Sequence, residues 1–160
     1  PLGLMTRASF EALKSEMERV DYELRTTIPR AIQRARELGD LRENGEFESA
    51  KLKQRQASER LLLLQRQLAD AQIIDELAID DSIVQPGTEV VLRPVDGPGE
   101  AFTFWILGEG DSRHGPEVVS YRAELGRALW RRRPGEEVAL PLPGGPRRVR
   151  IERVGKRLPA

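Results

Sequence analysis

Several residue types that build common functional sites are missing or scarce in this chain. Cysteine is absent, which excludes a disulfide scaffold, a thiolate zinc site and a cysteine nucleophile. His114 is the only histidine, so a metal site built on two histidines is excluded as well. The longest apolar runs, such as Leu61–Leu64, are too short to cross a bilayer, and we expect no membrane partner.

Neither sign of charge predominates. The chain has 26 Lys and Arg against 26 Asp and Glu, which excludes a general polyanion binder and an acidic solvating tail but allows local patches. Pro1–Leu4 is typical of a protease-tag remnant, with Met5 as the natural start, and the alternative is a natural N-terminal extension. No export signal precedes Met5, so we expect a cytoplasmic protein.

Glycine and proline divide the chain into two halves. Residues 6–85 contain only Gly39, Gly45 and Pro29, whereas both residue types are frequent from residue 86 onward. Because glycine and proline interrupt regular structure, the first half is predicted to be long helix and the second half short strands and turns.

Apolar positions in the first half recur at alternating spacings of three and four, which is a heptad seam. The first helical stretch carries Phe10, Leu13, Met17, Val20, Leu24, Ile28, Ala31, Ala35 and Leu38. The second carries Phe47, Ala50, Gln54, Ala57, Leu61, Leu64, Leu68 and Ala71. Two matching seams predict an antiparallel coiled-coil hairpin over residues 5–78, with arms on the order of 45 Å long and a kink near Pro29.

The second half shows the alternation of short strands. With one short helix at Ala123–Trp130, it predicts a small antiparallel β domain over residues 86–160, and an α+β fold for the chain. Residues 79–85 are the expected linker, and the apolar face of the domain predicts that it folds alone. The expected strands are Thr88–Val95, Ala101–Leu107, Glu117–Ser120, Glu136–Leu140 and Arg147–Val154.

Acidic residues crowd the turn of the predicted hairpin, over residues 40–48. Asp40 and Glu43 are three residues apart, so both carboxylates can face one hard cation such as Mg²⁺. Two carboxylates leave most of an octahedral shell unfilled, so this tip can only complete a metal site that belongs to another macromolecule. The alternative is that Asp40 or Asn44 caps the second helix.

Basic residues flank this acidic tip on both helices. Such a cluster can hold a nucleic-acid backbone while the acids act on it. The alternative is ordinary pairing along a helix face, such as Glu48 with Lys51. The cluster consists of Arg34, Arg36, Arg42, Lys51, Lys53 and Arg55.

The tip also carries a resemblance to a known family. Residues 36–47 read Arg-Glu-Leu-Gly-Asp-Leu-Arg-Glu-Asn-Gly-Glu-Phe, which is similar to the tip signature Gly-Asp-Leu-Lys-Glu-Asn-Ala-Glu-Tyr of the Gre transcript-cleavage factors, the bacterial GreA/GreB family. Further matches follow in order between Met5 and Val154, at Gln72–Asp75, Val119–Tyr121, Leu125–Leu129, Pro134–Val138 and Pro143–Gly145.

The resemblance implies a role in transcription elongation. Gre factors insert the coiled coil into the secondary channel of RNA polymerase and stimulate cleavage of the backtracked RNA 3′ end. The family's two tip acids correspond to Asp40 and Glu43, which would help bind the second Mg²⁺ of the polymerase and position a water. The chain would then be a monomeric accessory factor, not itself an enzyme, and would bind no cofactor alone.

The remaining site residues follow from the same resemblance. The family's basic residues near the tip correspond to Arg36 and Lys51, and RNA contact is expected to extend to Arg34 and Arg55. The C-terminal domain would be FKBP-like and would dock at the outer rim of the channel. The expected docking residues are Tyr121, Ala123, Glu124 and Arg127.

Some positions depart from the family pattern. Gly45 and Phe47 replace a familiar Ala and Tyr, and Phe47 is interpreted as a seam residue. Ala123 and Glu124 stand where Ser-Pro is common, and the basic run Arg131–Arg133 is heavier than expected. This run is interpreted as a solvated turn or as a contact with an acidic polymerase surface.

Other functions remain open beside cleavage. One is a channel-binding regulator or inhibitor of the polymerase without cleavage activity, and another is a coiled-coil interaction module unrelated to transcription. The pair Asp40 and Glu43, present in the cleavage arrangement, favours the cleavage factor. Three lone residues receive structural interpretations: His114 as an exposed loop residue, and Trp105 and Trp130 as core anchors.

Overall fold

The computed structural model describes residues 3–39 and 44–160. They form two compact units. The hairpin unit is Glu11–Asp70, and the sheet unit combines the start of the chain, through Phe10, with Ala71–Ala160. The predicted α+β class, with a helical hairpin followed by a small β domain, is confirmed, but the units divide at other residues than expected.

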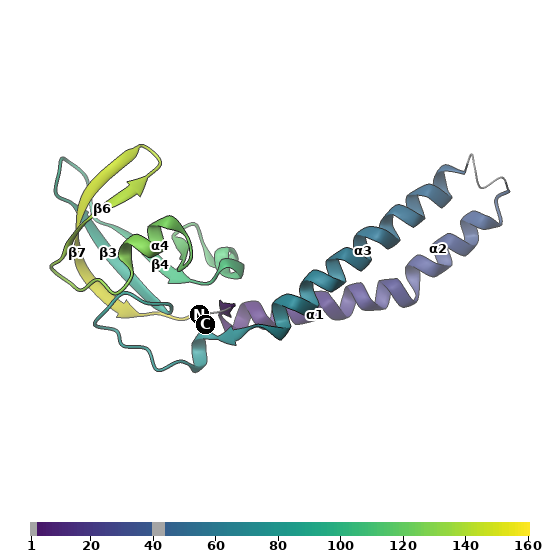
Figure 1. Ribbon diagram of the computed structural model, residues 1–160, viewed down its shortest axis with the longest axis horizontal. Coiled ribbons are helices and arrows are strands. Elements are labelled where there is room, and N and C mark those ends of the chain that lie inside the picture. Colours follow the sequence, from purple (N-terminus) through teal and green to yellow (C-terminus); the bar gives the residue numbers. More distant parts are fainter. Residues whose placement is uncertain (1–2, 40–43) are drawn as a thin grey trace. The chain divides into compact units, whose positions relative to one another are not determined.

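The hairpin is built from α1 (Arg7–Arg25), α2 (Thr27–Arg36) and α3 (Gly45–Ala69) (Figure 1). Heptad spacing places its apolar side chains on one stripe, and burial follows the predicted seam. Ile28 of α2 and Ala50 of α3, both seam positions, lie in one buried cluster, and Leu64 of α3 is fully buried. Ile32 belongs to the same cluster, although the predicted seam did not include it.

An ion pair also joins the two arms of the hairpin. The guanidinium of Arg60 on α3 donates hydrogen bonds to the carboxylate of Glu16 on α1, with Nη2 2.7 Å from Oε1 and 2.6 Å from Oε2. This two-pronged contact fixes the relative position of the side chains more tightly than a single hydrogen bond would.

The first arm is interrupted at Thr26, where the backbone leaves the helical region with φ −126° and ψ −70°. Thr26 Oγ1 donates to the carbonyl of Tyr22 at 2.7 Å, which partly replaces lost helical bonding. Pro29 has no N–H and cannot donate to the carbonyl four residues earlier. The kink predicted near Pro29 is therefore confirmed, three residues ahead of the proline.

The sheet unit contains a five-stranded sheet of order β5-β4-β3-β7-β6. Antiparallel pairs join β3 to β4, β3 to β7 and β6 to β7, whereas β4 and β5 are parallel. The parallel pair departs from the expected antiparallel sheet because the chain passes through η2 (Glu109–His114) before it forms β5. The strands are β3 (Thr88–Pro94), β4 (Phe102–Leu107), β5 (Val118–Ser120), β6 (Glu137–Leu142) and β7 (Gly145–Lys156).

The core of the sheet unit lies between this sheet and α4 (Glu124–Leu129). Successive side chains of a strand point to opposite faces of the sheet. Val90 and Leu92 of β3 are therefore fully buried in the core, whereas Arg93, on the opposite face, is exposed. Leu129 of α4 is also fully buried in this core. Other fully buried members are Ile106, Leu107, Leu140, Val149 and Ile151.

Residues 79–85, expected to be a linker, belong to the sheet unit. Val84 is fully buried, its N–H donates to the carbonyl of Arg132 at 2.9 Å, and its carbonyl accepts from Arg131 N at 2.9 Å. Ile79 packs against the same core. Because apolar side chains of this segment fill the core, the segment is not a free connection between two domains, and the linker prediction is wrong.

The start of the chain is also part of the sheet unit. β1 (Leu4–Met5) pairs in parallel with β2 (Gln72–Ile73), and both residues of β1 are buried. Leu4 N donates to the hydroxyl of Tyr121 at 3.2 Å. Residues 86–160 therefore lack side chains that complete the core, and the prediction that they fold alone is withdrawn.

A substitution at Gly108 tests how closely the start of the chain is packed. A Cβ atom at Gly108 would lie 1.9 Å from the carbonyl oxygen of Leu4, and backbone cannot move aside cheaply. Gly108→Ala is expected to lower the free energy of unfolding by about 2–3 kcal/mol, measured by urea denaturation. Gly110→Ala is the matched control, because a Cβ there meets no described atom within 4 Å. Equal stability of the two variants would contradict the close packing.

No helix in the described ranges is both long and apolar enough to span a membrane.

Candidate functional site

The start of α3 is capped by Asn44. Phe47 N donates to Asn44 Oδ1 at 3.0 Å, and Asn44 Nδ2 donates to the carbonyl of Ala35, which ties α3 to the end of α2. Asp40 and Glu43 lie outside the described residues, so their role stays a prediction. Since Asn44 supplies the cap, α3 does not need Asp40 for that purpose.

Phe47 is a seam residue, as interpreted from the sequence. Its ring packs against the buried cluster of Ile28, Ile32 and Ala50. An apolar ring fits this contact, because a phenolic hydroxyl in the same place would need a hydrogen-bond partner if it were buried.

The predicted RNA-contacting residues gather around two hollows of the hairpin unit. Arg34 of α2 and Lys53 of α3 line one hollow between the two helices. Lys51 and Arg55 of α3 line a second one. Arg36, exposed in the last turn of α2, lines neither. The structure thus brings Arg34 together with Lys53, and Lys51 together with Arg55; Arg42 lies outside the described residues.

Lys51 does not form the ion pair with Glu48 that was the alternative interpretation of its charge. Lys51 Nζ donates to Gln54 Oε1 at 3.0 Å and forms no ion pair with Glu48, although all three side chains are described. Glu46 and Glu48 instead stand in the first turn of α3, where carboxylates complement the helix dipole. This arrangement leaves the charge of Lys51 uncompensated by its expected helix-face partner.

A groove on the sheet unit, the α4 groove, is lined by Tyr121, Arg122, Arg127 and Trp130. Two of the predicted docking residues, Tyr121 and Arg127, are in this lining. The other two stand at the start of α4 and are not: Ala123 immediately precedes α4 and Glu124 is its first residue.

Sequence reasoning missed Arg122 and Trp130 as groove residues. Trp130 was expected to be a core anchor, yet 38% of it is exposed, whereas Trp105 is buried as predicted. The reason is the end of α4: the preceding Leu129 fills the core, and Trp130 follows as the C-cap residue.

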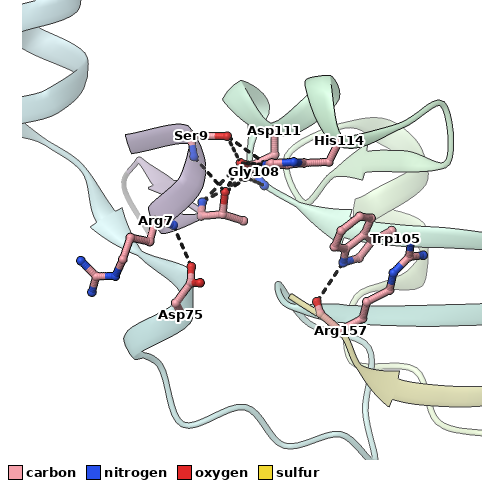
Figure 2. Close-up of polar contacts among 9 residues, drawn as sticks. Arg7, Ser9, Asp75, Trp105, Gly108, Asp111, His114 and Arg157 are labelled. Atoms are coloured by element: carbon pink, nitrogen blue, oxygen red, sulfur yellow. Dashed lines mark hydrogen bonds and ion pairs between the residues drawn. The ribbon is translucent and has the colours of Figure 1, made fainter. Parts of the chain in front are cut away.

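A second cluster joins the start of α1 to η2, and we call it the clasp: Thr6, Ser9, Gly108, Asp111 and His114. Asp111 is fully buried. Its carboxylate accepts from Thr6 N at 3.2 Å, Thr6 Oγ1 at 2.6 Å, Gly108 N at 2.9 Å and Ser9 Oγ (Figure 2). These hydrogen bonds satisfy the buried charge and tie residues about a hundred positions apart in sequence.

Ser9, His114 and Asp111 resemble a catalytic triad in composition only. Ser9 Oγ and Asp111 Oδ1 both face the same ring nitrogen, His114 Nε2, at 3.3 and 3.6 Å. In a triad the hydroxyl and the carboxylate meet different ring nitrogens. Because Ser9 is also fully buried and donates to Asp111, the arrangement is structural.

His114 itself is not the exposed loop residue that was expected. Only 15% of its side chain is exposed, and its ring lies 6.0 Å from that of Trp105 (Figure 2). A sequence signal marks only one end of the clasp. Thr6 caps the start of α1, with Ser9 N donating to Thr6 Oγ1 at 3.2 Å, and threonine is a preferred residue at that position.

Among residues 3–39 and 44–160, no three His, Asp or Glu side chains are placed to hold a metal ion. Asp40 and Glu43 are outside these ranges. The expected contribution to a shared Mg²⁺ site therefore stays a prediction from the sequence.

Family models match both halves of the chain. The model for the N-terminal domain of GreA/GreB transcription elongation factors matches residues 3–73, and the model for the C-terminal domain matches residues 79–156. The transcription elongation factor GreA of Thermotoga neapolitana is 33% identical over 153 residues, 96% of this chain and 97% of the relative. GreA of Desulfovibrio desulfuricans is 36% identical over 146 residues, 91% of this chain and 88% of the relative.

Solved structures of similar proteins also span the chain. The GreA factor homolog 1 of Thermus thermophilus matches with 23% identity and a TM-score of 0.42, covering 94% of this chain and 97% of that protein. A GreA/GreB elongation factor of Nitrosomonas europaea matches with 24% identity and a TM-score of 0.42, covering 97% and 98%. On the two family models and the relatives above 30% identity, this chain belongs to the GreA/GreB family of transcription elongation factors.

Proposed function

We propose that this elongation factor inserts the tip of its hairpin unit into the secondary channel of RNA polymerase and stimulates hydrolysis of backtracked RNA. The observation that carries the proposal is the pair Asp40 and Glu43, three residues apart between the end of α2 and the start of α3. With α3 already capped by Asn44, these acids are not required to begin the helix.

Carboxylates suit the chemistry that the proposal requires. Mg²⁺, when bound in the polymerase active centre, stabilises the attacking and leaving oxygens of a phosphoryl transfer. Asp40 and Glu43 would supply two oxygen ligands, and the polymerase and water would supply the others. A carboxylate oxygen can also accept a hydrogen bond from the attacking water and so orient it. The chain would act as an accessory factor, not as an enzyme alone.

The basic side chains of the hairpin unit would hold the RNA. Arg34 with Lys53, and Lys51 with Arg55, line the two hollows and can donate to phosphate oxygens there; Glu46 also lines the first hollow. Arg36, exposed at the end of α2, is the described member of this set nearest in sequence to the tip acids. The sheet unit would meanwhile dock on the polymerase at the α4 groove, which contains Tyr121 and Arg127.

The test is a cleavage assay. The full chain is added to a stalled, backtracked elongation complex with Mg²⁺, and the RNA is examined for shortening. Shortened RNA that depends on the added chain supports the proposal. Binding to the complex without shortening would instead identify a channel-binding regulator without cleavage activity, and no binding would overturn both functions.

Arg36→Ala and Lys51→Ala are expected to weaken RNA contact and leave the chemistry intact. The concentration of factor for half-maximal cleavage should rise, and the slope of log affinity against log salt should fall by about 0.7 for each lost phosphate contact. Lowering the salt concentration should therefore restore part of the loss. Lys14→Ala, at an exposed position on α1, is the control. A defect that does not change with salt would assign Arg36 and Lys51 to ordinary helix-face charge.

A further inference from the structure

We propose that the α4 groove binds an acidic polypeptide segment that carries an apolar side chain, with Arg127 and Arg131 meeting its carboxylates around Trp130. This inference rests on the proposed docking to RNA polymerase, because it states the chemistry of the polymerase segment that this groove would take. All of the residues involved belong to the sheet unit.

The floor of the groove is aromatic. Trp130 is 38% exposed, and the ring of Tyr121 carries the guanidinium of Arg122 at 5.6 Å from its centroid. Aromatic and arginine side chains at a partly exposed hollow are the residue types that dominate binding energy at protein interfaces. The exposed indole gives an apolar side chain of a partner a surface to cover.

The chain segment that forms the groove and follows it is rich in arginine. Residues 121–135 contain five arginines and one acid, Glu124. Arg132 pairs with Glu136 at 3.4 Å. Arg133 contributes to the lowered pKa of the Asp80 carboxyl, after the larger effect of the hydrogen bonds from Ser82.

Arg127 and Arg131 have no such compensation. Within the part of the chain that the structure describes, neither guanidinium forms an ion pair. Two uncompensated guanidinium groups beside an exposed indole favour a partner that brings carboxylates, because guanidinium and carboxylate meet through two parallel hydrogen bonds.

The backbone at Arg131 supports a role for its side chain. Arg131 has φ +60°, the left-handed region, where glycine is favoured and another residue costs roughly 1 kcal/mol. It follows the C-cap of α4, where glycine commonly ends a helix. Arginine stands there nonetheless, and its guanidinium lies 5.9 Å from the centroid of the Trp130 ring. A local preference overridden in this way indicates that the side chain serves a function other than folding.

The same geometry favours a polypeptide over a single-stranded nucleic acid. Base stacking requires open aromatic faces. Here Tyr121 is buried to 6% exposure, and a guanidinium already lies over a face of each ring. The groove therefore offers one partly exposed indole and not a series of open rings for successive bases, whereas its guanidinium groups suit carboxylates.

The first experiment titrates the full chain with a synthetic peptide in which one leucine is flanked by glutamates. The matched peptide has glutamines in their place, and a single-stranded oligouridine tests the nucleic-acid outcome. Tryptophan fluorescence reports binding, because Trp105 is buried and Trp130 is exposed. We expect the glutamate peptide to bind at least about tenfold more tightly than the glutamine peptide. Equal binding of the two, no binding, or preferred binding of the oligouridine would overturn the proposal.

Two variants test whether the arginine side chains bind the peptide without a role in the stability of the fold. Arg131→Gly should be at least as thermally stable as the wild type, since its φ suits glycine, yet should bind the glutamate peptide about tenfold more weakly. Arg127→Gln should weaken binding to a similar degree. Lys156→Gln, an exposed position on β7, is the charge-matched control and should bind normally. Normal peptide binding by both arginine variants would contradict the inference.

The cleavage assay distinguishes this inference from the proposed function. If the wild type stimulates cleavage and both arginine variants do so at the same concentrations, the groove proposal fails while the proposed function stands. If the wild type neither binds nor stimulates polymerase, the proposed function fails, and the peptide titration still decides whether the groove takes an acidic segment.

Discussion

Asp40→Ala and Glu43→Ala are each expected to lower the rate of stimulated RNA cleavage by at least about a hundredfold, because each removes a carboxylate that would hold Mg²⁺ and orient water. Polymerase binding should remain close to that of the wild type. Neither residue belongs to the sheet unit, where docking is proposed. Cleavage rates at saturating factor, together with a separate binding measurement, check both parts of the prediction.

Glu48→Ala is the matched control for the two tip variants. It removes the same charge from the first turn of α3, where Glu48 is exposed, and should leave the cleavage rate nearly unchanged. Because Asn44 holds the cap, the tip variants should lose less than about 1 kcal/mol of stability. Cleavage at the wild-type rate by the double variant Asp40→Ala, Glu43→Ala would contradict the metal-completing role.

Asp111→Ala is expected to destabilise the sheet unit by about 3–5 kcal/mol. Its carboxylate is fully buried and accepts from Thr6 N, Thr6 Oγ1 and Gly108 N, so its removal leaves those donors buried without an acceptor. Urea unfolding of the full chain, followed by circular dichroism, measures the loss.

Asp75→Ala provides a control of the same chemistry in a less buried place. Asp75 is half-buried and accepts from the N–H of Arg7, next to Thr6 in sequence, at 2.7 Å (Figure 2). Its loss should cost about 1 kcal/mol, the usual contribution of a helix cap. If Asp111→Ala is no more harmful than Asp75→Ala, the clasp does not hold the start of α1.

Patterns that repeat along the chain made most of the fold predictable. The heptad seam placed Ile28 and Ala50 together, and the alternation of β3 placed Val90 and Leu92 in the core. Both arise because burial selects apolar residues at the period of the secondary structure. Proline chemistry likewise predicted the kink near Pro29.

Contacts that do not follow a repeating pattern in the sequence could not be predicted in this way. Asp111 meets Thr6 and Ser9 across more than a hundred residues, and nothing in the local sequence of a Gly-rich loop shows which distant donors will reach its carboxylate. Val84 joins the core through a single side chain, which is too short a signal to distinguish a core segment from a linker.

The candidate functional residues were likewise predictable only in part. The tip residues Asp40 and Glu43 could be identified because their spacing and the surrounding signature lie in one continuous segment. The α4 groove could be identified only in part. Composition favours burial of a tryptophan, and the exposure of Trp130 depends on where α4 ends.

The placement of β7 has a consequence for how the protein is made. The hairpin unit is one continuous stretch, Glu11–Asp70, so it can fold while the remainder of the chain is still being synthesised. The sheet unit cannot, because β7 lies between β3 and β6 and is synthesised after both. A nascent chain that ends before β7 would therefore contain a folded hairpin without a complete sheet unit. If docking uses the sheet unit as proposed, such a chain would not compete with complete copies for polymerase.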